Sequence, residues 1–120
     1  MSRVLLVDDE ALVLRFYGRL LEAGGHQVRT AATLSEALRM LDENAPEVLL
    51  MDLRMPSIED GLRLIRAVPD GAGVKVIVMS GWVEDLRDHP EQQRVDVLLP
   101  KPVRAEVLLR SVARPLAAGA

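Results

Sequence analysis

Four short apolar runs recur along the chain, and each of them ends in a small polar or charged motif. Amphipathic stretches with helical spacing separate these runs. Short runs alternating with helical patterns predict an α/β fold in which helices cover both faces of a parallel sheet. The runs are Val4–Val7, Val48–Met51, Val76–Met79 and Val97–Leu99, and the motifs that follow them are Asp8-Asp9, Asp52, Ser80-Gly81 and Lys101-Pro102.

Length and composition narrow the class of protein further. The chain has 120 residues, enough for one domain with one core and too few for two. Its net charge of -3 disfavours a nucleic-acid surface as its main role. It has no cysteine, which excludes disulfides and thiolate metal sites and makes a cytoplasmic location the default expectation. Neither a signal peptide nor a membrane span is visible.

The pattern predicts five strands and at least four helices. A first helix should follow Asp9 and end at Gly24-Gly25, with Phe16 among its inward-facing residues. A second should begin at Thr33 or Ser35, and the last near Val103. Between Trp82 and Arg94, Pro90 would break a long helix, so the fourth helix should be short or broken. The expected strands are Arg3–Val7, Gln27–Ala31, Val48–Asp52, Lys75–Met79 and Val97–Leu99.

The four motifs should converge, because ligands of an open parallel sheet bind beyond the carboxyl ends of its strands. Carboxylates crowded there repel one another, and hard oxygen ligands without sulfur suit Mg²⁺. Asp52 can attack a phosphoryl group as a carboxylate nucleophile, while Lys101 and Ser80 can contact phosphate oxygens. Each motif alone also has a purely structural explanation as a cap or a turn, but those explanations do not account for all four at strand ends.

With these motifs, nearly the whole chain resembles the receiver domain of two-component response regulators. The matching segments are Val7–Glu10, Met51–Pro56, Gly61 at the opening of the third helix, Met79–Gly81 and Pro100–Val103. The resemblance implies a doubly wound, flavodoxin-like sheet of five parallel strands in the order 2-1-3-4-5. We expect the receiver domain to cover residues 1–115, and residues 116–120 to be a frayed tail or the start of a linker.

The resemblance also implies roles for individual residues. Asp52 would be the phosphoacceptor, and Asp9 a direct ligand of Mg²⁺. Asp8 would act on the metal through water, and Asp52 and the backbone carbonyl of Arg54 would complete the protein ligands. Two further implied roles are those of Ser80, the switch hydroxyl, and Lys101, the partner of the phosphate.

The implied function is phosphoryl signalling in a two-component system. A histidine kinase or phosphotransfer protein would supply the phosphoryl group, and the altered domain would regulate an unknown output domain or protein partner. The domain would not be an enzyme beyond Mg²⁺-dependent self-phosphorylation and slow autodephosphorylation. No direct contact with nucleic acid or membrane is expected, and a homodimer is compatible with the family.

Several positions depart from the family. Asp52 and Gly61 are nine residues apart, one more than is usual, which places an extra residue within Ser57–Asp60. Leu98 stands where the family often has an aromatic switch residue. The resemblance also implies that Arg54 and Trp82 occupy positions that tune the rate of phosphate loss. Trp82 would either partly shield the acyl phosphate from water or be a surface aromatic residue that packs on the remnant of the fourth helix.

Two other functions compete with this interpretation. A pseudo-receiver would keep the fold as an interaction module that never carries phosphate, but such modules tend to lose one or more of the acidic and basic residues retained here. An aspartate-nucleophile phosphatase would need a second carboxylate as general acid at the position of Arg54, and a guanidinium cannot serve in that role.

Overall fold

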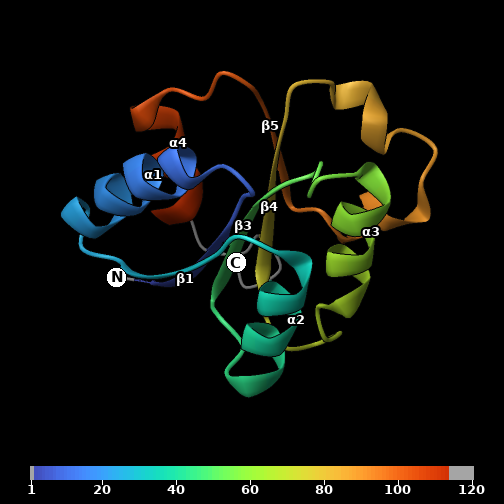
Figure 1. The fold of residues 1–120 in the computed structure, drawn as a ribbon, viewed down its shortest axis with the longest axis horizontal. Helices are drawn as coiled ribbons and strands as arrows, with labels where there is room; N and C mark the ends of the chain where they lie inside the picture. The colour runs from blue at the N-terminus through green and yellow to red at the C-terminus, as the bar shows by residue number, and fades with distance from the viewer. Residues whose placement is uncertain (1, 114–120) are drawn as a thin grey trace.

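The computed structural model describes residues 2–113, and Figure 1 shows a central sheet with helices on both of its faces. The five strands are parallel and lie in the order β2-β1-β3-β4-β5, which confirms the predicted fold and strand order. The strands are β1 (Arg3–Val7), β2 (Gln27–Ala31), β3 (Val48–Asp52), β4 (Lys75–Ser80) and β5 (Val97–Pro100). The helices are α1 (Ala11–Ala23), α2 (Leu34–Glu43), α3 (Ile58–Ala67) and α4 (Ala105–Ala113), with two 3-10 turns, η1 (Val83–Leu86) and η2 (Pro90–Arg94).

The apolar sequences of the central strands follow from their burial on both faces. Every residue of β3 and β4 is buried, whereas β2, at the edge, is mostly exposed or half-buried. Successive side chains point to opposite faces of the sheet. Leu6 and Leu50 therefore pack in the core under α1 and α4, and Leu5 and Leu49 pack in the core under α2 and α3.

Two helices begin at the capping residues that physical chemistry favours. The Thr33 hydroxyl accepts a hydrogen bond from the Glu36 backbone N–H at 3.1 Å at the start of α2. The Ser57 hydroxyl accepts one from the Asp60 backbone N–H at 3.2 Å at the start of α3. Each cap satisfies a backbone donor that has no partner within its helix. Of the two predicted starts for the second helix, Thr33 is the observed cap.

The broken fourth helix is confirmed. Between β4 and β5 the chain forms η1 and η2 in place of a continuous helix, with Pro90 in the first turn of η2. Proline restricts the residue before it and lacks the backbone N–H that a longer helix needs. The expectation for residues 116–120 lies outside the described residues. Within residues 2–113 no helix is both long enough and apolar enough to span a membrane.

The prediction that Phe16 packs in the core is wrong. Its side chain is 63% exposed, and Leu12, one turn earlier on α1, is 75% exposed. The helix carries more large apolar side chains than one face can bury, and Leu21 and half-buried Tyr17 fill the inner face. Hydrophobic periodicity identified the helix but could not decide which of two overlapping stripes faces inward.

Gly61 does not open the third helix, because α3 begins earlier, at Ile58. The glycine instead permits a close approach between α3 and the loop after β3. A Cβ atom at this position would lie 1.8 Å from the carbonyl oxygen of Leu53. The range in which we placed the extra residue, Ser57–Asp60, forms the cap and first turn of α3. The last helix also starts later than predicted, at Ala105.

Candidate functional site

The carboxyl ends of β1, β3, β4 and β5 bring the four sequence motifs to one edge of the sheet. Asp8 follows β1, Asp52 and Ser80 end β3 and β4, and Lys101 follows β5. The Lys101 backbone N–H donates a hydrogen bond to the Ser80 carbonyl at 2.8 Å, which extends the pairing of β4 with β5. Apart from Arg3, the residues of β1, β3 and β4 are buried, so the side chains at the ends of these strands project from the packed core.

A single ammonium group joins two of the carboxylates. The Lys101 Nζ atom donates a hydrogen bond to Asp52 Oδ2 at 2.8 Å and lies 3.8 Å from Asp8 Oδ2. Burial by itself would lower the pKa of Lys101, but the hydrogen bond and negative charge of Asp52, with the charges of Asp8 and Glu10, outweigh it and raise that pKa. Lys101 is therefore positively charged, and its ammonium group lies between the carboxylates at the ends of β1 and β3.

Asp8 is the most deeply buried of the acidic residues at this edge. Its side chain is 0% exposed, and its Oδ1 atom accepts a hydrogen bond from the Glu10 backbone N–H at 2.9 Å. Its Oδ2 atom has no hydrogen-bond partner among residues 2–113. Burial raises the pKa of Asp8 from 3.8 to about 6, a rise that the Asp52 and Asp9 charges increase and the hydrogen bond from Glu10 and the Lys101 charge oppose. A buried carboxylate oxygen without a partner is costly, and a cation would relieve that cost.

The donor set fits a divalent cation of the Mg²⁺ type. Carboxylate oxygens of Asp8, Asp9 and Glu10 lie within 4.8 Å of one another, and Asp9 and Glu10 are exposed. Carboxylates without sulfur or histidine suit a hard cation that keeps several waters. Sequence analysis assigned no role to Glu10, although the unbroken run of three acidic residues was a visible signal.

Asp52 is held by contacts at both carboxylate oxygens. Oδ2 accepts from Lys101, and Oδ1 accepts a hydrogen bond from the Arg54 backbone N–H at 3.2 Å. The residue is 8% exposed, so the carboxylate borders solvent in spite of its burial. A nucleophile needs this combination of fixed orientation and access.

Ser80 lies at the same edge, but its hydroxyl is engaged with its own loop. The Oγ atom donates to the Trp82 carbonyl at 2.8 Å and accepts from the Trp82 backbone N–H at 3.1 Å. The Trp82 side chain is 64% exposed. Leu98, at the position without an aromatic ring, is half-buried against the core under α2 and α3.

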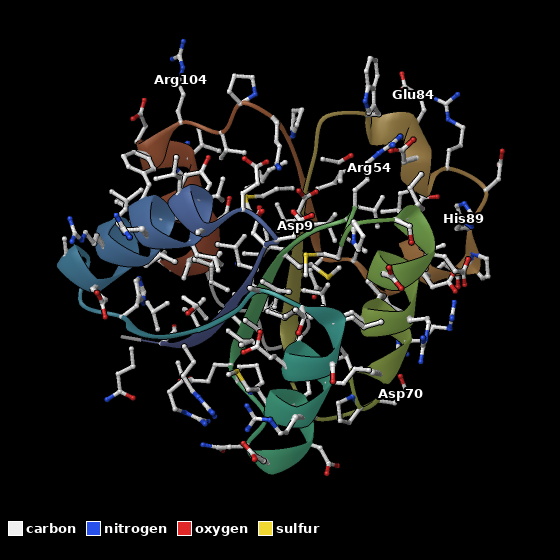
Figure 2. All side chains as sticks on the ribbon, in the orientation of Figure 1. Asp9, Arg54, Asp70, Glu84, His89 and Arg104 are labelled. Atoms are coloured by element: carbon white, nitrogen blue, oxygen red, sulfur yellow. The ribbon has the colours of Figure 1, made fainter. Side chains whose placement is uncertain are left out.

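Arg54 makes an ion pair that sequence analysis did not foresee. Its Nε and Nη2 atoms both lie 3.0 Å from Asp85 Oδ2, on η1. Figure 2 shows the labelled Arg54 side chain extending from the loop after β3 toward η1, where Glu84 is also labelled. No sequence signal links these residues, because they lie in separate loops and meet only in the fold.

Comparisons with known proteins agree with this geometry. Residues 4–113 match the family model described as the response regulator receiver domain. The chain is 35% identical over 111 residues to the transcriptional regulatory protein PrrA of Mycobacterium tuberculosis, covering 90% of this chain and 47% of the relative. It is 44% identical over 102 residues to the virulence transcriptional regulatory protein PhoP of Salmonella typhimurium, covering 82% of this chain and 41% of the relative.

A solved structure gives the same result for the fold. The response regulator receiver domain protein from Clostridium thermocellum superposes with a TM-score of 0.78 at 31% identity, covering 93% of this chain and 91% of that one. The chain spans less than half the length of the two curated relatives, so their names describe longer proteins than the segment compared.

Proposed function

The chain belongs to the response regulator receiver domain family of two-component systems, and from that premise we propose that Asp52 accepts a phosphoryl group from a phosphohistidine. The observation that carries the proposal is the Lys101 Nζ contact to Asp52 Oδ2 at 2.8 Å. That contact holds the carboxylate at the sheet edge beside the acidic group of Asp8 and Asp9.

In the proposed reaction an Asp52 carboxylate oxygen bonds to phosphorus while the phosphorus–nitrogen bond of the donor breaks. The electron pair of that bond stays on the imidazole nitrogen, which takes up a proton. Lys101 is placed to pair with a phosphoryl oxygen as the new charge develops. Asp8 and Asp9, with Asp52 and the Arg54 carbonyl, would hold Mg²⁺, which when bound offsets negative charge on the transferring oxygens.

Ser80 is the proposed switch residue. Its hydroxyl donates to the Trp82 carbonyl, so contact with a phosphoryl oxygen requires it to leave that partner. Such a move would change the loop that leads into η1. Leu98 has no aromatic ring to follow the serine, so we propose that the change travels through the backbone of this loop instead.

A protein donor is supported by the surface of α1. Exposed Leu12 and Phe16 line an apolar depression with Leu20, flanked by Arg15 and Arg19. The helix begins directly after the acidic group, so a partner seated there would lie beside Asp52. An apolar surface with arginines at its edge suits a helix of the donor protein that carries an apolar stripe flanked by acidic residues. We propose this face of α1 as the docking site of the histidine kinase or phosphotransfer protein, in the cytoplasm.

We also propose that the exposed Trp82 ring partly shields the acyl phosphate from attacking water. Trp82→Ala should then shorten the lifetime of the acyl phosphate, and an unchanged lifetime would show that the tryptophan has no part in retaining it. The output remains a domain or protein of unspecified kind, reached through the η1, β5 and α4 surface.

The direct test is binding of beryllofluoride, a mimic of the phosphoryl group, measured by calorimetry. Binding that requires both Mg²⁺ and Asp52 is expected, so Asp52→Asn should abolish it. No binding in wild type with Mg²⁺ present would favour the pseudo-receiver, an interaction module that does not carry phosphate.

A further inference from the structure

A continuous series of contacts leads from Asp52 to Ser80 by way of η1. The Arg54 backbone N–H donates to Asp52 Oδ1 at 3.2 Å, and the Arg54 guanidinium holds Asp85 Oδ2 at 3.0 Å. The Asp85 backbone N–H donates to the Trp82 carbonyl at 3.0 Å, the same oxygen that accepts from the Ser80 hydroxyl at 2.8 Å. The Arg54–Asp85 ion pair thus connects the surroundings of Asp52 to the loop that carries Ser80 and Trp82.

The two partners differ in how tightly they are held. The Arg54 side chain is 51% exposed, whereas that of Asp85 is 15% exposed. Asp85 is also fixed by its backbone within the turn of η1. The guanidinium is therefore the partner that is free to move, and it sits on the residue whose backbone already contacts Asp52.

We propose that the Arg54–Asp85 ion pair is a latch that the phosphoryl group on Asp52 opens by competing for the guanidinium. The inference rests on the proposed function, because it requires phosphate on Asp52. It assigns Asp85 the role of a regulatory residue that restrains η1 in the unphosphorylated domain. Arg54 passes from Asp85 to the phosphoryl oxygens, and η1 loses its tie to the loop after β3.

The competition favours the phosphoryl group on physical grounds. An acyl phosphate presents several acceptor oxygens and more than one negative charge, and a guanidinium binds such groups through two parallel hydrogen bonds. Asp85 offers one carboxylate, of which only Oδ2 contacts Arg54. A half-exposed ion pair is weak, so a stronger anion nearby can displace it. Leu98 provides no aromatic switch. The ion pair therefore couples Asp52 to η1 in addition to the proposed change in the loop after Ser80.

Competition between Asp85 and the phosphoryl group for Arg54 determines whether a substitution raises or lowers the affinity for beryllofluoride. Removing the charge of Asp85 frees Arg54 in advance, so Asp85→Asn should bind beryllofluoride more tightly than wild type, by about two- to fivefold. Arg54→Gln should bind it more weakly. In the Arg54→Gln background, Asp85→Asn should have no further effect, because the guanidinium for which Asp85 and beryllofluoride compete is absent.

The experiment is calorimetric titration of beryllofluoride with Mg²⁺ into wild type, both single variants and the double variant. Glu84→Gln is the matched control, since it removes the same charge from the neighbouring residue. The Glu84 side chain is exposed and makes no hydrogen bond or ion pair within the described part of the chain. Asp85→Ala serves as a second variant, and equal thermal midpoints establish that each protein is folded.

Hydrogen exchange distinguishes a latch from a purely structural role of the Arg54–Asp85 ion pair, because only a latch predicts that the ligand changes the exchange rate of η1. Beryllofluoride should speed amide exchange in residues 83–86 of wild type, whereas Asp85→Asn should show fast exchange before any ligand is added. Weaker or unchanged affinity in folded Asp85→Asn, or an equal effect with and without Arg54, would overturn the latch. If wild type itself fails to bind beryllofluoride, both the proposed function and the latch are wrong. If wild type binds it but the variants do not behave as expected, only the latch is wrong.

Discussion

Lys101 Nζ lies 2.8 Å from Asp52 Oδ2 and 3.8 Å from Asp8 Oδ2, so one cation contacts carboxylates at the ends of two different strands. Asp9 and Glu10 add negative charge at the same edge. A single ammonium cannot offset this much acidity, and Asp8 Oδ2 is left without a hydrogen bond among residues 2–113. The excess of negative charge makes the metal-free site a source of instability that a divalent cation would remove.

Asp8→Asn should stabilise the metal-free protein at neutral pH by about 1–2 kcal/mol. The amide keeps an oxygen for the Glu10 N–H but carries no buried charge. Because burial raises the pKa of Asp8 to about 6, the folded state holds the proton more tightly than the unfolded state, and stability falls as pH rises from 3.8 to about 6. The gain from Asp8→Asn should therefore be present above about pH 6 and fade below it.

Urea unfolding in the presence of a chelator measures this effect. Adding Mg²⁺ should stabilise wild type and leave Asp8→Asn nearly unchanged, because ligand binding stabilises only the state that binds it. A variant less stable than wild type in chelator would mean that the Asp8 carboxylate is well accommodated without a metal.

Gly61→Ala should destabilise the fold by about 2 kcal/mol or more, because overpacking against backbone cannot relax cheaply. The new Cβ atom would stand 1.8 Å from the Leu53 carbonyl oxygen. Gly18→Ala is the matched control, since a Cβ there meets nothing within 4 Å and α1 gains a better helix former. Thermal unfolding should show opposite signs for the two substitutions. A neutral Gly61→Ala would contradict the close approach of α3 to the loop after β3.

Glu91 should make the stability of the protein depend on pH in the acidic range. Its Oε2 atom lies 2.6 Å from Arg66 Nη1, which ties η2 to α3, and this hydrogen bond holds the pKa of Glu91 below its usual 4.5. A carboxyl with a lowered pKa in the folded state contributes stability above its unfolded pKa and loses it as pH falls through the folded pKa. Wild type should exceed Glu91→Gln in stability at neutral pH, and the gap should close below 4.5. A gap that is constant with pH would show that the charge of Glu91 is irrelevant.

Phe16→Ser should slow phosphoryl transfer from a phosphorylated histidine kinase by about fivefold or more, because exposed aromatics often dominate interface energies. Acetyl phosphate needs no docking surface, so its reaction with the same variant should match wild type. The two rates, measured side by side, separate docking from chemistry. Equal slowing with both donors would place the defect in the fold or the acceptor, and no slowing with the kinase would exclude this face of α1 as its docking site.

The sequence was sufficient for the fold because its signals were local and mutually consistent. Apolar runs marked β1, β3, β4 and β5 to within a residue, since central parallel strands such as β3 are buried on both faces. The edge strand β2 is mostly exposed or half-buried and has no such run, so it was predicted from the alternation of short strand-like segments with helical patterns. Pro90 marked the broken fourth helix, because proline acts on its immediate neighbours. The sheet order came from the family resemblance, and the meeting of Asp8, Asp52 and Lys101 followed from the edge that parallel strands share.

What the sequence could not supply depended on contacts between distant segments. The outward rotation of Phe16 is set by how α1 sits on the sheet, which helical periodicity does not specify. The Arg54–Asp85 pair joins loops 31 residues apart, and nothing in either loop marks the other. The engagement of the Ser80 hydroxyl with Trp82 is likewise a matter of side-chain torsion at a turn.

Esterification of Asp52 by phosphate at this acidic edge can be tested by locating the modified residue. Wild type is incubated with acetyl phosphate and Mg²⁺, the acyl phosphate is trapped by borohydride reduction, and the peptides are mapped by mass spectrometry. We predict one modified residue, Asp52, with no modification in chelator or in Asp52→Asn. An unmodified wild type, or phosphate retained in folded Asp52→Asn, would show that Asp52 is not the phosphoacceptor.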